Sequence, residues 1–384
     1  MNFELIYLDH AAATPVDQRV IDAMLPFMSE KFFNPSSPYA PAIAVRREYE
    51  AAKHRLAICI GGKADEIVMT AGATESINLM FGSVGGHVVT STIEHHAVLS
   101  AARRHDHTLV AVGPSGVIEP KDVAAAITPE TQLVSIALAN NELGTIQPLR
   151  DIAEIIRQER RNRLDAGNTT PLYFHSDASQ GVGQIDVNVA RLGVDAITIN
   201  AGKVYGPKQI GLLWTSSHVR LSPQIVGGGQ ERGLRSGTEN VAGTIGFALA
   251  LELATDHRKS ESVRLSRLRD TLEAALLDAF PEAVVTGSQK RRLPGHLHIS
   301  FPNVDAERVI FGLEARGVMV ATGSACAANK GTRSHVLTAV GLSPEVADGS
   351  LRITLGRLTD EGKIERAAGI MVEVIKYEIS RSAA

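Results

Sequence analysis

Short apolar runs rich in β-branched residues alternate with helical patterns between about residues 67 and 215 of the 384-residue chain. Strands that helices cover on both faces show such continuous apolar runs, whereas half-exposed strands alternate apolar and polar residues. The pattern therefore predicts an α/β fold with a large, mainly parallel sheet and helices on both of its faces. The expected strands are IVMT (67–70), HVVTS (87–91), LVAV (109–112), LVSIALA (133–139), LYFHSD (172–177), DAITIN (195–200) and IGLLW (210–214).

The pattern changes after a glycine-rich stretch at 227–229. A long segment rich in Ala, Leu, Glu and Arg predicts a helix over about 239–279 that leads into a second domain. We expect a large α/β domain over 15–258 and a smaller α+β domain formed by 1–14 and 259–384. The smaller domain should contain a strand at 296–301, a helix at 305–316, a loop with Cys326, a strand at 350–355 and a helix at 359–379.

Charge and cysteine content narrow the possible functions. The 39 basic and 42 acidic side chains give a net charge of −3. The chain therefore lacks the excess of positive charge that direct binding of nucleic acid or of a membrane requires. Two cysteines, Cys59 and Cys326, exclude a disulfide framework or a cysteine-rich zinc site and suit a reducing compartment. Glu4 stands where a signal peptide carries positive charge, and no apolar run reaches membrane-spanning length. We therefore expect a cytoplasmic protein.

A candidate phosphate site follows the first expected strand, in TAGATES at 70–76. Small residues and hydroxyls there would let backbone N–H groups at a helix N-terminus approach a phosphate. The alternative is that Thr74 merely caps a surface helix. The glycine fingerprints of P-loop and dinucleotide-binding proteins do not occur in the sequence.

Asp177 ends the expected strand 172–177, and Lys203 follows the next one. The carboxyl ends of strands line the ligand crevice of an open α/β sheet. A carboxylate at that edge can keep a ring nitrogen protonated, although Asp177 could equally be a turn residue or a helix cap. Lys203, in NAGKVYGPK at 200–208, can form a Schiff base and move a proton once its pKa is lowered. A surface lysine is the alternative, and Lys208 is an equal candidate.

Cys326 stands in GSACAANKG at 323–331, whose composition is typical of a loop. An accessible thiol with a pKa of about 8.5 is partly thiolate near neutral pH and readily becomes a nucleophile. Cys59, in LAICI at the apolar end of an expected helix, is interpreted as a small buried side chain.

Of the adjacent His95 and His96, only one is expected to face the crevice, where it could stack on a flat cofactor. Neither has the i, i+4 partner of a helical zinc pair, and we expect no metal site. Arg352 lies inside an apolar strand and requires a carboxylate, from either a substrate or a structural ion pair. His296 and His298 share one strand face and are interpreted as ordinary surface or core residues.

Taken together, these segments resemble the cysteine desulfurases of the NifS/IscS type, which have the aspartate-aminotransferase-like fold of enzymes that use pyridoxal 5′-phosphate (PLP). The resemblance runs nearly from end to end, and GSAC with the long loop that follows it is similar to the NifS/IscS subgroup rather than the SufS-like one. The matching segments are YLDHAAATP (7–15), NPSS (34–37), GATES (72–76), EHHAVL (94–99), NNELG (140–144), HSDASQ (175–180), KVYGPK (203–208), GGGQERGLRSGT (227–238), GSAC (323–326) and LRITLGR (351–357).

The resemblance implies a role for each matching residue. Lys203 corresponds to the Schiff-base lysine and Cys326 to the cysteine that carries the persulfide. The resemblance implies that these two residues and His95 are catalytic. The implied cofactor contacts are Ala73, Thr74 and Asn200 at the phosphate, His95 stacked on the ring, Asp177 at the ring nitrogen, Gln180 at the ring hydroxyl, and Thr238 on a loop that reaches the neighbouring subunit's phosphate. Asn141 and Arg352 correspond to the clamp for the substrate carboxylate.

The implied reaction converts L-cysteine to L-alanine and leaves a persulfide on Cys326. A homodimer and a sulfur-acceptor protein, for iron–sulfur assembly or thiolation, are the implied partners. An aminotransferase or a selenocysteine lyase on the same fold is the alternative enzyme, and a protein without activity is a further alternative.

Two positions depart from the family. The usual Ser-x-His-Lys is Asn200-Ala201-Gly202-Lys203 here, so that Gly202 lacks one donor to the PLP phosphate. We expect weaker retention of PLP for this reason. Tyr39-Ala40 stands where a histidine is common after NPSS.

Overall fold

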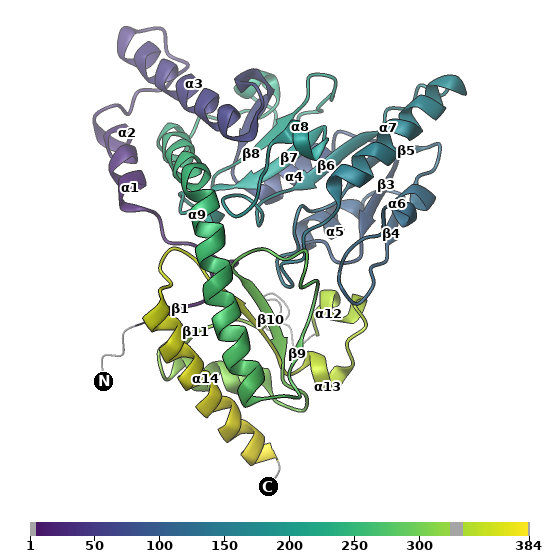
Figure 1. Ribbon diagram of the computed structural model, residues 1–384. Helices are drawn as coiled ribbons and strands as arrows, with labels where there is room; N and C mark the ends of the chain where they lie inside the picture. The colour runs from purple at the N-terminus through teal and green to yellow at the C-terminus, as the bar shows by residue number, and fades with distance from the viewer. Residues whose placement is uncertain (1–4, 323–332, 383–384) are drawn as a thin grey trace.

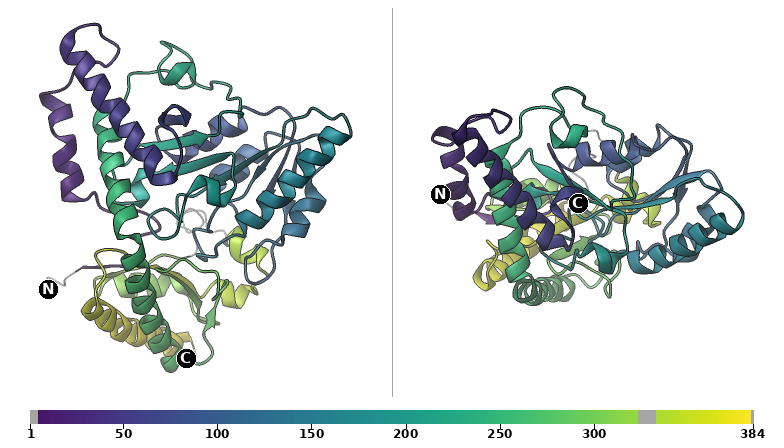
Figure 2. Two further views of the ribbon diagram at one scale, coloured as in Figure 1. Left: turned by 45° about the horizontal axis from the view of Figure 1, so that its top comes forward. Right: turned by 90° about the horizontal axis from the view of Figure 1, so that it is seen from above.

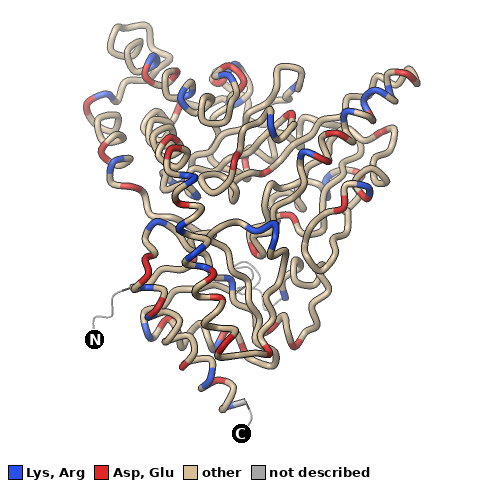
Figure 3. The backbone as a smooth tube through the Cα atoms, in the orientation of Figure 1, with Lys and Arg blue, Asp and Glu red and all other residues tan. Residues whose placement is uncertain are grey.

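The computed structural model describes residues 5–322 and 333–382, so Cys326 lies outside the described residues. The elements form a larger and a smaller part, and the helix α9 (Val241–Ala279) runs along both of them (Figures 1 and 2). Acidic and basic residues are interspersed over both parts in Figure 3. None of the helices in the described ranges is long and apolar enough to cross a bilayer.

The larger part is built on a seven-stranded sheet with the strand order β2-β8-β7-β6-β5-β3-β4. β8 is antiparallel to both of its neighbours, and the other neighbouring pairs are parallel. The predicted α/β fold with a mainly parallel sheet is thus confirmed. The strands are β2 (Ile67–Thr70), β3 (His87–Ser91), β4 (His107–Val110), β5 (Thr131–Ser135), β6 (Tyr173–Asp177), β7 (Ala196–Asn200) and β8 (Gly211–Thr215), of which β4 and β5 begin two residues before the predicted position.

Helices cover both faces of this sheet. Ile67 and Met69 of β2 belong to a core with α3 (Ala40–Ile60), α7 (Leu149–Asp165) and α9. Val68, between them, packs with α4 (Ala73–Phe81) and α5 (His96–Ala102) on the opposite face. Because side chains alternate along a strand, burial on both faces explains the continuous apolar runs in the sequence. The remaining helices of this part are α1 (Gln18–Met24), α2 (Pro26–Ser29), α6 (Pro120–Ala126) and α8 (Val189–Leu192).

The smaller part contains an antiparallel sheet with the order β12-β10-β9 and the parallel pair of β1 and β11. The helices and strands predicted after residue 279 are confirmed, except that the Cys326 loop lies outside the described residues. The elements are β1 (Ile6–Tyr7), β9 (Val284–Val285), β10 (His296–Ser300), α10 (Ala306–Glu314), β11 (Val318–Met319), α12 (His335–Ala339), α13 (Pro344–Ala347), β12 (Ser350–Thr354) and α14 (Glu361–Ser382).

The predicted long helix is confirmed, and it contributes to two separate cores. Ala254 belongs to the core of the larger part, whereas Leu265 belongs to the core of the smaller part. Leu8, near the N-terminus, also packs in the smaller core. The predicted domain boundary at residue 258 falls between these two positions on α9 and stays a prediction.

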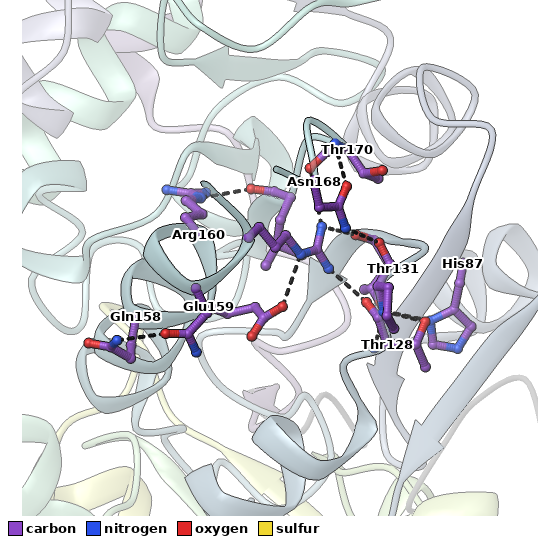
Figure 4. A network of polar contacts seen from close by, with 12 residues as sticks. His87, Thr128, Thr131, Gln158, Glu159, Arg160, Asn168 and Thr170 are labelled. Atoms are coloured by element: carbon purple, nitrogen blue, oxygen red, sulfur yellow. Dashed lines mark hydrogen bonds and ion pairs between the residues drawn. The ribbon is translucent and has the colours of Figure 1, made fainter. Parts of the chain in front are cut away.

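A buried arginine fastens the C-terminal end of α7 to the amino edge of the sheet. The Arg163 guanidinium donates hydrogen bonds to the carbonyl oxygens of Thr128 (2.7 Å), Thr131 (2.9 Å) and Thr170 (3.2 Å). Its Nε lies 3.0 Å from Glu159. Figure 4 shows the surrounding network, which extends through Thr131 to His87. One side chain thus supplies donors to three backbone carbonyls in the segments around the end of α7.

Replacing Arg163 by Met should lower the free energy of unfolding by roughly 3 kcal/mol, because three carbonyls lose a charged donor. Urea unfolding of the two proteins measures the difference. Arg161→Met, at an exposed position of the same helix, is the matched control and should change stability by less than about 0.5 kcal/mol. Equal unfolding midpoints for the Arg163 variant and the wild type would contradict the expectation.

Candidate active site

The carboxyl ends of the strands meet at one edge of the large sheet. Thr70, at the end of β2, and Asn200, at the end of β7, both lie opposite Gly211 on the two sides of β8. A Cβ on Gly211 would approach the Cα of Gly72 to 2.8 Å, so only glycine lets the turn after β2 come this close. The two turns that follow β2 and β7 therefore lie side by side.

A cavity of about 290 Å³ opens at this edge. Among the residues that line it are nine of the eleven predicted site residues: Ala73, Thr74, His95, Asn141, Asp177, Gln180, Asn200, Lys203 and Arg352. These residues come from six separated segments of the chain, and the fold brings them together. Thr238 is exposed and does not line this cavity, and Cys326 is outside the described residues.

Lys203 ends a short 3-10 turn that directly follows β7. The turn begins where the side-chain oxygen of Asn200 accepts a hydrogen bond from the N–H of Gly202 at 2.9 Å. The Lys203 Nζ donates to the carbonyl oxygens of Ala11 (2.8 Å) and Ala12 (2.6 Å). Desolvation and the nearby Arg352 lower the pKa of Lys203, although Asp177 and Asp9 oppose this effect. A lysine with a lowered pKa exchanges its proton more readily near neutral pH.

Lys208, the other candidate from the sequence, is not among the residues that line this cavity. Its Nζ donates to the carbonyl oxygen of Thr14 at 2.9 Å. It lines a neighbouring open pocket together with Gly72, Thr74 and Lys203. Lys208 therefore adds positive charge beside the N-terminus of α4.

The N-terminus of α4 faces this pocket without a capping side chain. Gly72 is the N-cap residue, with a φ of 136°, and no side chain among the described residues bonds to the first N–H groups of the helix. The nearest side-chain atom to a Cβ built on Gly72 is the Asn200 Nδ2, at 3.9 Å. Glu75 fixes the turn, since it accepts from the Ala71 N–H at 2.8 Å and pairs with Arg235 at 2.9 Å. The helix end is consequently both rigid and open to an anion.

Asp177 and His95 lie in the walls of the same cavity. One Asp177 oxygen accepts a hydrogen bond from the Ser179 N–H at 2.9 Å, which fixes the carboxylate. The Nδ1 of His95 accepts from the Ala97 N–H at 3.1 Å, so a neutral ring carries its proton on Nε2. Desolvation is the main cause that lowers the pKa of His95, and it is stronger than the opposing effect of Asp177. The expectation that only one adjacent histidine faces the crevice was wrong, because both His95 and His96 line the cavity.

Arg352 is buried and pairs with a carboxylate of the chain itself. Its Nη2 lies 2.7 Å from an Asp9 oxygen, and its Nη1 donates to the Asn141 carbonyl at 3.4 Å. The structural ion pair that the sequence left open is therefore present. Arg352 also lines the cavity, and its binding of a substrate carboxylate stays a prediction. Sequence reasoning missed Asp9, although its segment YLDHAAATP had been singled out.

Two buried carboxyls beside the cavity were also missed. Burial raises the pKa of Glu94 to about 7 and the pKa of Glu142 to about 6. Glu142 accepts a hydrogen bond from the Ser334 hydroxyl at 2.6 Å, and His335 bonds to the Glu94 carbonyl at 2.9 Å. Only the position of Glu94 directly before His95 could have drawn attention to it.

The remaining candidates lie outside this site. His296 and His298 are buried in β10, where desolvation lowers the pKa of each to about 3. Of the two positions that the sequence left open, surface or core, the structure shows the core. Cys59 ends up half-buried near the end of α3, and burial raises the pKa of its thiol to about 11. The sequence predicted a small buried side chain, whereas Cys59 is only partly buried where it packs against the core of the larger part.

The residues of the cavity fit PLP. An anionic phosphate suits the open α4 N-terminus with Lys208 nearby, a pyridinium nitrogen suits the Asp177 carboxylate, and an aldehyde requires a lysine such as Lys203. Thr74, His95, Gln180 and Asn200 lie between or beside these positions on the same walls.

Comparison with known proteins gives the same assignment. The family described as "Aminotransferase class-V" matches residues 6–366. A "Cysteine desulfurase IscS" of Dictyoglomus turgidum is 39% identical over 97% of this chain and 94% of its own length. Among solved structures, a "NIFS-like protein" aligns with a TM-score of 0.89 at 32% identity, over 97% of this chain and all of its own. "SspA in complex with cysteine" aligns with a TM-score of 0.78 at 33% identity, over 91% and 98%.

The fold and the site thus define a PLP-dependent enzyme of the class-V aminotransferase type. The chain belongs to this family and, within it, to the cysteine desulfurases of the IscS and NifS type.

The raised pKa of Glu94 predicts a specific pH dependence of stability. An unfolded glutamate has a pKa of about 4.3, so between this value and about 7 the folded state binds a proton that the unfolded state releases. The stability that Glu94 contributes is therefore present at low pH and is lost as the pH rises through about 7. Glu94→Gln keeps an oxygen for Ser91 and Ala137 but does not titrate.

The variant should therefore gain stability relative to the wild type as the pH is raised from 5 to 8. Urea unfolding of both proteins at each pH measures the difference. A difference that does not change with pH would contradict the assignment.

Proposed function

We propose that this cysteine desulfurase takes sulfur from L-cysteine, releases L-alanine and holds the sulfur as a persulfide on Cys326. The observation that carries the proposal is the single cavity in which Lys203, Asp177 and Arg352 meet. The nearly full-length similarity to cysteine desulfurases supports the same substrate. The similar solved structure "SspA in complex with cysteine" also supports cysteine as the substrate.

The cationic groups bind and orient the substrate. Arg352 presents a buried guanidinium to the cavity, where it would hold the substrate carboxylate together with the side chain of Asn141. The ion pair with Asp9 restricts the motion of this guanidinium and sets its direction. A substrate held in this way places its α-carbon in a fixed position relative to Lys203.

Lys203 moves the proton of the substrate α-carbon. Desolvation lowers the pKa of its amine, which increases the fraction of the basic form near neutral pH. PLP bound at this site supplies an electron sink for the charge that develops at the α-carbon. Asp177, which lines the same cavity, would hold a compensating negative charge.

The sulfur step requires a thiolate. Cys326 would attack the substrate sulfur, so that an S–S bond forms while the bond between sulfur and Cβ breaks, and protons added at Cβ and Cα complete alanine. The chain on both sides of 323–332 is attached to the cavity walls. Ala321 exchanges backbone hydrogen bonds with Arg352, and Ser334 donates to Glu142. These attachments support access of Cys326 to the site.

The partners belong to the same proposal. The exposed Thr238 would reach the phosphate site of a second copy of the chain, which requires a homodimer. An acceptor protein in the cytoplasm, for iron–sulfur assembly or thiolation, would then take the persulfide sulfur.

Incubation of the purified protein with cysteine tests the function directly. We expect alanine to form while Cys326 gains one sulfur atom, as mass spectrometry would detect. Cys326→Ala should abolish alanine formation from cysteine and keep the absorbance of bound PLP, whereas Cys59→Ala should remain active. Undiminished activity of Cys326→Ala would favour the aminotransferase or selenocysteine lyase alternative.

Gly202 generates a second prediction, about the affinity for PLP. A Cβ at this position would lie 3.3 Å from the Asn200 Oδ1 and 3.7 Å from the Lys208 Cγ, so a histidine needs only a small adjustment. A hydrogen bond to a charged group contributes about 1.5–3 kcal/mol, and Gly202→His should therefore tighten PLP binding roughly tenfold or more. Titration of the apoprotein with PLP measures the change. Gly202→Ala, which adds no donor, is the matched control, and an equal affinity of the two variants would refute the explanation.

A further inference from the structure

A second, smaller cavity lies behind Lys203. Its volume is about 60 Å³, and it is bounded by the N-terminal segment, the turn after β6, α9 and the smaller part. Ala11, Ser179, Gln180 and Lys203 line both this cavity and the active-site cavity. These four residues therefore form the wall between the two spaces, and we call the smaller one the rear cavity.

Three buried side chains of the rear cavity carry polar atoms that have no hydrogen-bond partner within the described ranges. They are the Nε2 of His10, the Oγ of Ser179 and both ring nitrogens of His296. The Nδ1 of His10 bonds to the Thr354 carbonyl at 3.0 Å, and a carbonyl can only accept. Since desolvation lowers the pKa of His10, its neutral ring presents an accepting Nε2.

These features are those of a cavity that holds water. A buried water molecule needs roughly 10–15 Å³ and two to four polar partners, so a polar cavity of this volume accommodates several. Apolar cavities of similar size stay dry, but the hydroxyl and imidazole groups here provide both donors and acceptors. Burying such groups without partners is unfavourable, and water would supply the missing bonds.

The rear cavity also extends to the protein surface. Ala254, His257, Glu261 and Leu265 follow one another at helical spacing on one face of α9 and line the cavity. His257 is exposed, and Glu261 is partly exposed. The lining thus runs from solvent at α9 to Lys203, on the side away from His95 and Thr74.

We infer that water in the rear cavity exchanges protons between Lys203 and solvent, independently of the opening through which the substrate enters. The inference rests on the proposed role of Lys203 in moving the α-proton. In one exchange, Lys203 gives the proton taken from the substrate to a water molecule and receives another proton in return, so charge is conserved. The hydrogen returned to the α-carbon then comes from solvent.

A substitution at Ala254 on α9 can fill the rear cavity, and Ala254 is not a residue that contacts the substrate. Ala254→Leu places an apolar side chain in the rear cavity. Ala274→Leu makes the same substitution at an exposed position of the same helix and is the matched control. Both holoenzymes are given L-cysteine with deuterium at the α-carbon in ordinary water, and mass spectrometry measures the deuterium in the alanine formed.

The wild type and Ala274→Leu should retain little deuterium at Cα, whereas Ala254→Leu should retain several-fold more. Equal retention in all three proteins overturns the inference. If the wild type forms no alanine at all, the proposed function fails instead, and the two failures are distinguishable.

A crystal structure of the wild-type holoenzyme provides a test that does not depend on activity or on the folding of a variant. We expect ordered water within hydrogen-bond distance of the His10 Nε2 and the Ser179 Oγ. A rear cavity without water density overturns the inference.

Discussion

The site depends on one constraint of the backbone, which is that neighbouring parallel strands all end at the same edge of a sheet. The N-terminus of α4 follows β2, Asp177 ends β6, and Lys203 follows β7. β8 lies between β2 and β7 and is antiparallel to both, so it lets the turns after these strands meet across Gly211. A side chain at Gly211 would separate them. The chemistry of the cavity thus follows from strand direction before any individual side chain is considered.

Burial then sets the charge states around that edge. Desolvation lowers the pKa values of Lys203, His10 and His95, and it raises those of Glu94 and Glu142. Each shift favours the neutral form of the group. The neutral forms can exchange protons, whereas Arg352 stays charged and is paired with Asp9. The cavity therefore combines groups that can move protons with a fixed cation that binds a carboxylate.

The N-terminal segment and α9 connect the two parts of the molecule around this cavity. The carbonyls of Ala11 and Ala12 hold Lys203 of the larger part, while Asp9 holds Arg352 of the smaller part. α9 contributes to both apolar cores. Hence the N-terminal segment and α9, which contact both parts, set the position of Lys203 relative to Arg352.

The sequence by itself determined the strands, the long helix and most of the site residues. Continuous apolar runs are a direct consequence of burial on both faces. Motifs such as GATES and KVYGPK are short and continuous in the sequence, so they can be recognised without the tertiary structure. The sequence could not give the pairing of Asp9 with Arg352, the buried carboxyls or the rear cavity. These features join residues hundreds of positions apart, and only packing decides which polar groups lose their water. The tertiary structure therefore decided the partners and protonation of the site, because desolvation depends on neighbours that no local pattern records.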